Sequence, residues 1–248
     1  MYLVIGRFPF LISIATIFIA GSIQGIGSSF VSTLFVIFVI ILGIFLTLII
    51  SKILSKTILK GMPSSFVLEL PPYRKPQFGK ILIRSIFDRT LFVLGRSISV
   101  AAPAGLVIWL FANLGINGQN LLSIIANFFE PFAKLMGLDG YILTAFILGI
   151  PANEIVLPII LMCYLRNTSL INLEDTFSIG NILIEHGWNM LTAINVMLFT
   201  ILHFPCATTL LTIKKETGSW KWTFLSFALP TLCGIIICMF TTFIYNLF

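Results

Sequence analysis

The sequence predicts an all-α, polytopic helical membrane protein with about five to six hydrophobic segments, one of them broken or re-entrant. The composition is the first reason: 58% of the 248 residues are hydrophobic and only 10% are charged, whereas a soluble domain is about 25% charged. The apolar runs are the second reason. They are continuous and approach the roughly 20 residues that a helix needs to cross a bilayer, whereas the strands of a membrane β-barrel alternate apolar and polar residues.

The N-terminal part, residues 1–50, contains two of the expected spans. The run 8–26 is apolar but becomes rich in Gly and Ser in its second half. The run 30–50 is rich in β-branched residues and Phe, and its length matches the bilayer core. We therefore expect two membrane-crossing segments joined by a turn before residue 30.

Residues 51–89 form a basic stretch that we expect to be a cytoplasmic loop. More than half of the basic residues of the chain lie here, namely Lys52, Lys56, Lys60, Arg74, Lys75, Lys80, Arg84 and Arg89. An excess of Lys and Arg beside apolar spans is the positive-inside pattern, which argues against a nucleic-acid partner. From Gly79 onward apolar residues recur at helical spacing, which predicts an amphipathic helix on the inner membrane surface.

Residues 90–248 hold the remaining hydrophobic segments. They are a span over 90–114, a shorter segment over 120–137 that Glu130-Pro131 interrupts, the segment 141–165, a run over 190–213 and a last run over 222–247. The short segment suits an interfacial or re-entrant helix better than a full crossing. A Trp beside an apolar run is usually a membrane-interface anchor, which is the role we expect for Trp188.

The segment 141–165 is apolar, yet Pro151, Asn153, Glu154 and Pro158 lie in its middle. A charged side chain at the bilayer centre costs about 2.5–3.5 kcal/mol on insertion scales, and each proline removes a backbone donor and obstructs a helix. The segment should therefore face protein or a water-filled cavity, and it is the first candidate for a functional site. Its flanking stretches are not basic, so it either dips into the membrane and returns or crosses with a weak charge bias.

Two chemical readings of this segment remain open. Broken backbone exposes carbonyl groups that can bind a cation, and Glu154 and Asn153 could add oxygen ligands. Alternatively, Glu154 forms a structural ion pair with Arg96 inside the helix bundle. The two readings are compatible.

The run 190–213 contains a second candidate, His203 and Cys206. Residues three apart share a face of a helix, and imidazole and thiolate suit a transition metal better than calcium or magnesium. The alternative is a span kinked at Pro205, with a buried, hydrogen-bonded His and an inert Cys. The chain contains no G-x-x-x-x-G-K-[ST] phosphate loop, so we expect no nucleotide hydrolysis.

Three strings together resemble the membrane region of the ferrous iron transport protein B (FeoB) family. They are Phe66-Val-Leu-Glu-Leu-Pro-Pro-Tyr-Arg-Lys-Pro76, Pro151-Ala-Asn-Glu154, and Cys206-Ala-Thr-Thr-Leu followed by Lys215-Glu-Thr-Gly-Ser-Trp-Lys-Trp222. The resemblance implies iron(II) uptake, with Fe2+ as the transported substrate, across the cytoplasmic membrane of a prokaryote. Family members pair an N-terminal GTP-binding domain with two gate repeats that are related to nucleoside transporters.

The resemblance also implies a division of this chain. Residues 1–50 would be the end of the first gate repeat, 51–89 the basic loop, and 90–248 the second gate repeat. The GTP site and GTP hydrolysis would lie outside this chain, which would then be no enzyme. Its expected partners are the lipid bilayer and the upstream GTP-binding and first gate half of the transporter, and a homo-oligomer is left open.

The resemblance carries over residue by residue to part of the candidate site. Glu154 and Cys206 match positions in the family's second gate motifs. Asn153 stands where many members have Lys, and His203 stands where many have an aromatic residue. The expected function is therefore part of an iron(II) permease, with Glu154, Asn153, His203 and Cys206 as candidate ligands. The alternatives are a non-conducting structural or regulatory module that docks the upstream half, and a nucleoside-type carrier.

Overall fold

The computed structural model describes residues 8–20, 28–57, 90–116, 119–165 and 176–247, with single positions at 79, 83 and 87. The chain divides into two compact units, Met1–Gly43 with Val100–Phe248, and Ile44–Ser99. The first unit contains the candidate residues of 150–206. Most of the expected basic loop and amphipathic helix lies outside the described residues.

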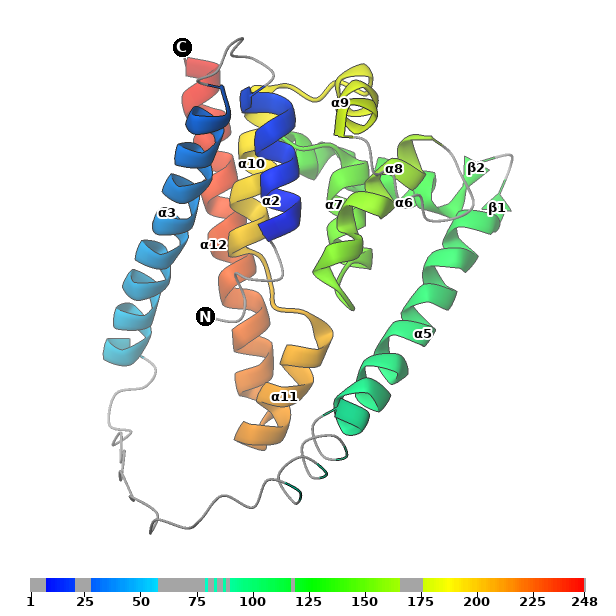
Figure 1. Ribbon diagram of the computed structural model, residues 1–248, viewed down its shortest axis with the longest axis vertical. Helices are drawn as coiled ribbons and strands as arrows, with labels where there is room; N and C mark the ends of the chain where they lie inside the picture. Colours follow the sequence, from blue (N-terminus) through cyan, green and yellow to red (C-terminus); the bar gives the residue numbers. More distant parts are fainter. Residues whose placement is uncertain are drawn as a thin grey trace. The chain divides into compact units, whose positions relative to one another are not determined.

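The described chain is helical almost throughout, as predicted (Figure 1). The elements are α2 (Phe8–Ala15), η1 (Thr16–Ala20), α3 (Ser28–Thr57), α5 (Phe92–Asn113), α6 (Leu121–Leu135), α7 (Gly140–Leu148), η3 (Asn153–Ile155), α8 (Val156–Tyr164), α9 (Thr176–Glu185), α10 (Met190–Leu202), α11 (Ala207–Thr217) and α12 (Trp220–Leu247). Between α5 and α6, β1 (Gly115–Ile116) pairs antiparallel with β2 (Gln119–Asn120).

Among the described residues, three helical stretches are long and apolar enough to cross a membrane: Phe30–Ile53, Met190–Thr217 and Trp220–Leu247. A fourth is added if the bent pair α6 and α7 counts as one span. The chain is thus a polytopic helical membrane protein, with slightly fewer spans than the five to six expected. The difference arises because several apolar runs fold into helices that are short or sharply bent.

Helices α6 and α7 meet at a bend of 110°. A Cβ atom on Gly140 would lie 2.0 Å from the Ala126 carbonyl oxygen, so the close approach of the two helices requires glycine there. The Gly140 N–H donates to Glu130 Oε2 at 2.7 Å. Asp139 caps α7 by accepting from the Ile142 N–H at 2.6 Å. Glu130-Pro131 therefore does not interrupt this segment, because α6 continues through Pro131 and Glu130 secures the bend.

The segment 141–165 is a helical hairpin rather than one straight span. Helix α7 runs to Leu148, a turn follows, and α8 returns, so the rings of Tyr141 and Tyr164 lie 5.8 Å apart. Pro151 lies in the turn, where its missing N–H breaks no helical hydrogen bond. Of the two alternatives left open by the sequence, this geometry agrees with a segment that dips and returns.

Helix α12 runs alongside α10 and α11 (Figure 1). A buried polar cluster joins α10 and α12 to the C-terminal end of α6: Asn195 Nδ2 donates to the Met136 carbonyl oxygen at 2.8 Å and to Thr242 Oγ1 at 2.9 Å. Thr241 donates to Asn195 Oδ1 at 2.5 Å. Asn195 is fully buried, so these bonds satisfy an amide that would otherwise be costly.

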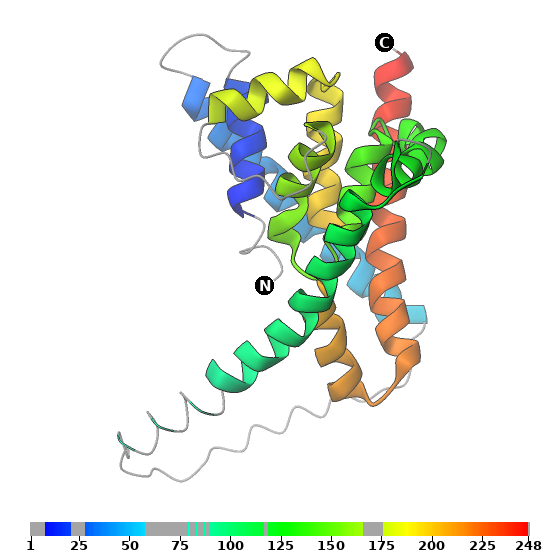
Figure 2. The same ribbon diagram turned by 90° about the vertical axis from the view of Figure 1, so that its right-hand side faces the viewer.

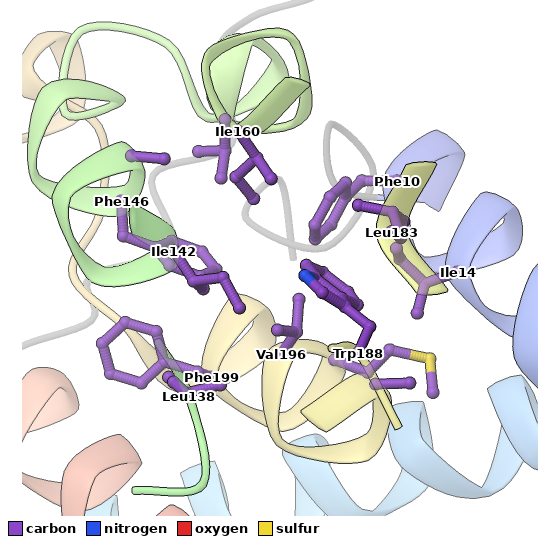
Figure 3. Close-up of a cluster of buried hydrophobic side chains, with 14 of the residues drawn as sticks. Phe10, Ile14, Leu138, Ile142, Phe146, Ile160, Leu183, Trp188, Val196 and Phe199 are labelled. Atoms are coloured by element: carbon purple, nitrogen blue, oxygen red, sulfur yellow. The ribbon is translucent and has the colours of Figure 1, made fainter. Parts of the chain in front are cut away.

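The core of the first unit lies between α2, α7, α8, α9 and α10 (Figure 3). Figure 3 shows side chains of these helices converging, among them Ile142 and Phe146 from α7 and Phe199 from α10. The rings of Phe146 and Phe199 meet edge to face, 4.9 Å apart. This packing fixes the hairpin against α10, just where α10 ends.

Candidate functional site

Two helix breaks meet in the first unit. The turn between α7 and α8 contains Ile150, and α11 begins at Ala207 after the break that follows α10. The Ala207 N–H donates to the Ile150 carbonyl oxygen at 2.8 Å. Helix ends leave backbone groups without intrahelical partners, and this bond satisfies a donor at one break with an acceptor from the other. We call the residues 149–155 and 203–207 the junction.

The junction lies near the middle of the stretch Met190–Thr217. Helix α10 has 13 residues and α11 has 11, which correspond to lengths of roughly 20 Å and 16 Å. Figures 1 and 2 show α9 at one end of the unit and the α11–α12 turn at the other. In a hydrocarbon core of roughly 30 Å, we expect a break at this position to lie near the midplane.

His203 and Cys206 do not share a helix face, so that prediction was wrong. His203 is the residue that ends α10, with ψ of 176°, and Cys206 is the residue that precedes α11, with ψ of 158°. Pro205 cannot continue the hydrogen-bond ladder of α10 and excludes helical backbone from Phe204, so the chain is broken between His203 and Cys206. The two side chains bracket a break instead of lining one helix.

His203 is 2% exposed and lies among phenylalanine rings. Its ring centroid is 5.0 Å from that of Phe146, 5.6 Å from that of Phe199 and 4.9 Å from that of Phe204. Nδ1 lies 2.9 Å from two backbone carbonyl oxygens, those of Phe199 and Thr200. Nε2 lies 3.3 Å from Asn153 Oδ1. The buried, hydrogen-bonded His of the alternative reading is therefore present, and it also contacts the other break.

Cys206 is half-buried at the N-terminus of α11. Its Sγ lies 3.1 Å from the hydroxyl oxygens of Thr208 and Thr209. A helix N-terminus carries partial positive charge, and in each of these two contacts either the thiol or the hydroxyl can be the donor. Thiolate is the form of cysteine that binds metals.

Glu154 does not join the other candidates. It lies in η3 beside Asn153, but its side chain is exposed. Within the described ranges, no group of three or more His, Cys, Asp or Glu side chains could hold a metal ion together. The side chain of Arg96 lies outside the described residues, as does its expected ion pair with Glu154. The structure thus brings Asn153 to His203 and places Cys206 beside the backbone contact of the junction.

A polar network at the open end of the hairpin was not predicted. Tyr164 donates its hydroxyl proton to Asp139, and Trp188 Nε1 donates to the Tyr164 oxygen at 2.8 Å. The His186 ring stacks on Tyr164 with centroids 4.4 Å apart. Trp188 is 4% exposed, so it is a buried anchor and not the interfacial one expected. Burial raises the pKa of Asp139 above its usual value. The available signal was Asp139 before Gly140, a typical helix N-cap position.

Comparison with known proteins gives two family matches. Residues 36–88 match the family described as "Ferrous iron transport protein B C terminus". Residues 94–220 match the Gate family, described as "Nucleoside recognition". The second match covers more than half of the chain and includes both helix breaks. The first of these descriptions names a part of a transport protein.

Individual relatives agree with these matches. The Fe(2+) transporter FeoB of Staphylococcus aureus (strain COL) is 29% identical over 221 residues, covering 86% of this chain and 31% of the relative. The Fe(2+) transporter FeoB of Methanocaldococcus jannaschii is 26% identical over 220 residues, covering 83% of this chain and 31% of the relative.

The chain spans about a third of the length of these curated relatives. No solved structure matches the chain. The chain belongs to the Gate family and represents the C-terminal membrane region of the ferrous iron transport protein B family.

Proposed function

We propose that the chain forms part of the transmembrane pathway for iron(II), and that the cation passes the junction of the two helix breaks. The observation that carries this proposal is the contact between breaks, Ala207 N–H to the Ile150 carbonyl oxygen, with the His203–Asn153 contact beside it. Broken helices near the midplane are how many transporters build ion sites. The relatives named as Fe(2+) transporters supply the cargo.

The chemistry of the junction suits a cation in transit. Imidazole nitrogen and thiolate sulfur suit first-row transition metals, and His203 and Cys206 provide one of each. A conducting site must bind strongly enough for entry and weakly enough for exit. A cation that binds one ligand after another satisfies this condition better than a cation that several ligands surround at once. The described part of the chain contains no group of three ligands.

The orientation follows from charge. Lys214, Lys215 and Lys221 lie at the α11–α12 turn, and the positive-inside rule assigns this end to the cytoplasm. The Asp139–Tyr164–Trp188 network then lies toward the outside. We further propose that 90–248 forms the second gate repeat, that 1–50 ends the first, and that the GTP-binding and upstream gate half act as partners in a prokaryotic plasma membrane.

Uptake of radiolabelled iron(II) tests the pathway. Cells without their own iron(II) transporter would express the chain together with the upstream half, under reducing conditions. Cys206→Ala should lower uptake at least about tenfold if the thiolate supplies about 1.4 kcal/mol or more to passage. Cys233→Ala is the matched control, because Cys233 is also half-buried but lies within α12. Equal uptake by both variants would refute the site.

The description of the Gate family favours a second candidate, a nucleoside-type carrier. Addition of excess uridine or adenosine to the iron uptake assay separates the two functions. The iron(II) proposal predicts unchanged iron uptake and no uptake of labelled nucleoside. Competition by nucleoside, together with nucleoside uptake, would support the carrier.

A third candidate is a non-conducting module that docks the upstream half. It predicts co-purification of the two parts and iron uptake that is insensitive to substitutions at the junction. The iron(II) pathway predicts co-purification together with loss of uptake in Cys206→Ala. The two candidates therefore differ in the rate of iron uptake that they predict for Cys206→Ala.

A further inference from the structure

The inference concerns the nitrogen of His203 that faces the hairpin, and it rests on the proposed function only for the identity of the cargo. We propose that Asn153 is a latch and not a ligand: its amide occupies Nε2 of His203 in the state seen here, and a cation reaches Nε2 only after the amide turns aside. The observation that supports this proposal is the distance of 3.3 Å between the amide oxygen Oδ1 of Asn153 and Nε2 of His203.

The surroundings of Nδ1 decide which His203 nitrogen can bind a cation. Two carbonyl oxygens lie 2.9 Å from Nδ1, and a carbonyl oxygen only accepts hydrogen bonds. Nδ1 therefore carries a proton. In the neutral ring Nε2 then holds the lone pair, and a backbone carbonyl on the opposite nitrogen is the usual support of a metal-binding histidine. His203 is thus held in the tautomer that binds a metal through Nε2.

The Asn153 amide is suited to block that nitrogen without binding it tightly. The oxygen and nitrogen of an amide are assigned from the hydrogen-bond network and are interchangeable by a half-turn, so the amide can present N–H to the lone pair. A distance of 3.3 Å exceeds the 2.7–3.2 Å of ordinary hydrogen bonds to nitrogen donors. The contact is therefore weak enough for a cation to displace.

The backbone around Asn153 allows the amide to move alone. Asn153 is half-buried at the start of η3, the single turn that follows the hairpin tip. The tip itself is held by the hydrogen bond between Ile150 and Ala207. Rotation of the Asn153 side chain would break its contact with Nε2 while this backbone contact stays in place. The latch thus needs no movement of the helices.

Cobalt(II) binding to the purified full chain in detergent tests the latch, with the visible absorption of the metal as the readout. Asn153→Ala should tighten binding about two- to tenfold, the range expected for one net hydrogen bond. In Asn153→Ala/His203→Ala the gain should disappear. Asn113→Ala is the matched control, because it removes an exposed amide that donates to the Trp109 carbonyl oxygen. Thermal unfolding of each variant verifies that it is folded.

The outcomes separate the latch from the proposed function. Weaker binding in Asn153→Ala would make Asn153 a ligand and would overturn the latch, and unchanged binding would overturn it as well. If cobalt binding is absent, or is the same with and without His203, both the latch and the iron(II) pathway through His203 fail. A His203-dependent site that Asn153→Ala does not tighten would leave the pathway standing and refute the latch.

Discussion

Replacement of Gly140 by alanine tests whether the bend between α6 and α7 positions the hairpin. The added Cβ would lie 2.0 Å from the Ala126 carbonyl oxygen and 2.9 Å from Glu130 Oε2. The first contact is with backbone, so it cannot be relieved by a side-chain rotation, and the helices must separate by about 1 Å to reach normal contact distance. That movement also stretches the 2.7 Å hydrogen bond from Gly140 N–H to Glu130.

The expected cost combines two effects. Overpacking typically costs about 1–3 kcal/mol, and a buried hydrogen-bonding group left without its partner costs about 1–3 kcal/mol. Gly140→Ala should therefore lower the free energy of unfolding by about 2–6 kcal/mol. In Gly105→Ala, the added Cβ would have no atom within 4 Å, and alanine in the middle of α5 should stabilise by about 0.5–1 kcal/mol.

Unfolding of the chain in mixed micelles, followed by circular dichroism, measures both variants on one scale. The close packing at the bend predicts that Gly140→Ala lowers the free energy of unfolding and that Gly105→Ala raises it. A change below about 0.5 kcal/mol in Gly140→Ala, which is typical of neutral surface substitutions, would refute the close packing of α6 against α7.

Three further predictions concern the polar groups that hold the first unit together. Asn195→Leu removes the donor to the Met136 carbonyl oxygen and to Thr242, so the free energy of unfolding should fall by about 2–4 kcal/mol; no loss relative to the exposed control Asn113→Leu would contradict the buried cluster. Trp188→Phe removes the hydrogen bond to Tyr164 and should cost about 1 kcal/mol, whereas the exposed Trp109→Phe should be neutral in the same unfolding assay. Burial raises the pKa of Asp139 above 3.8, so the folded chain holds this proton more tightly than the unfolded chain does. The contribution of Asp139 to stability is then greatest below pH 3.8 and decreases as pH rises through the folded-state pKa. Asp139→Asn should flatten this part of a melting-temperature profile, and an unchanged slope would exclude Asp139 as its source.

The features that sequence reasoning predicted correctly depend on local chemistry. Composition and continuous apolar runs predict a helical membrane protein because lipid demands internally bonded backbone. Pro151 predicts a break because a missing N–H acts within one turn of helix. The same local rule, applied to Glu130-Pro131, failed. Pro131 stays inside α6, whose packing against α7 at Gly140 depends on residues outside the reach of a local rule.

The features that sequence reasoning missed depend on distant residues. The contact of Ile150 with Ala207 joins positions more than fifty residues apart, and no spacing rule predicts how two breaks align. The helical spacing assumed for His203 and Cys206 failed because Pro205 ends α10 before the pair can share a face. Candidate ligands could therefore be chosen by side-chain chemistry, but only the fold shows that the Glu154 side chain is exposed while His203 is buried.

The most direct test of the junction as a water-filled pathway is the reactivity of Cys206. In proteoliposomes containing the chain with its upstream half, the cysteines Cys163, Cys233 and Cys238 would be replaced by alanine. A small, charged, membrane-impermeant thiol reagent would then be applied on both sides. The proposed pathway predicts that the reagent labels Cys206 and that iron(II) slows this labelling. It predicts no labelling of the chain in the variant that also carries Cys206→Ala. Cys206 that is unreactive toward this reagent, or labelled at the same rate with and without iron(II), would contradict it.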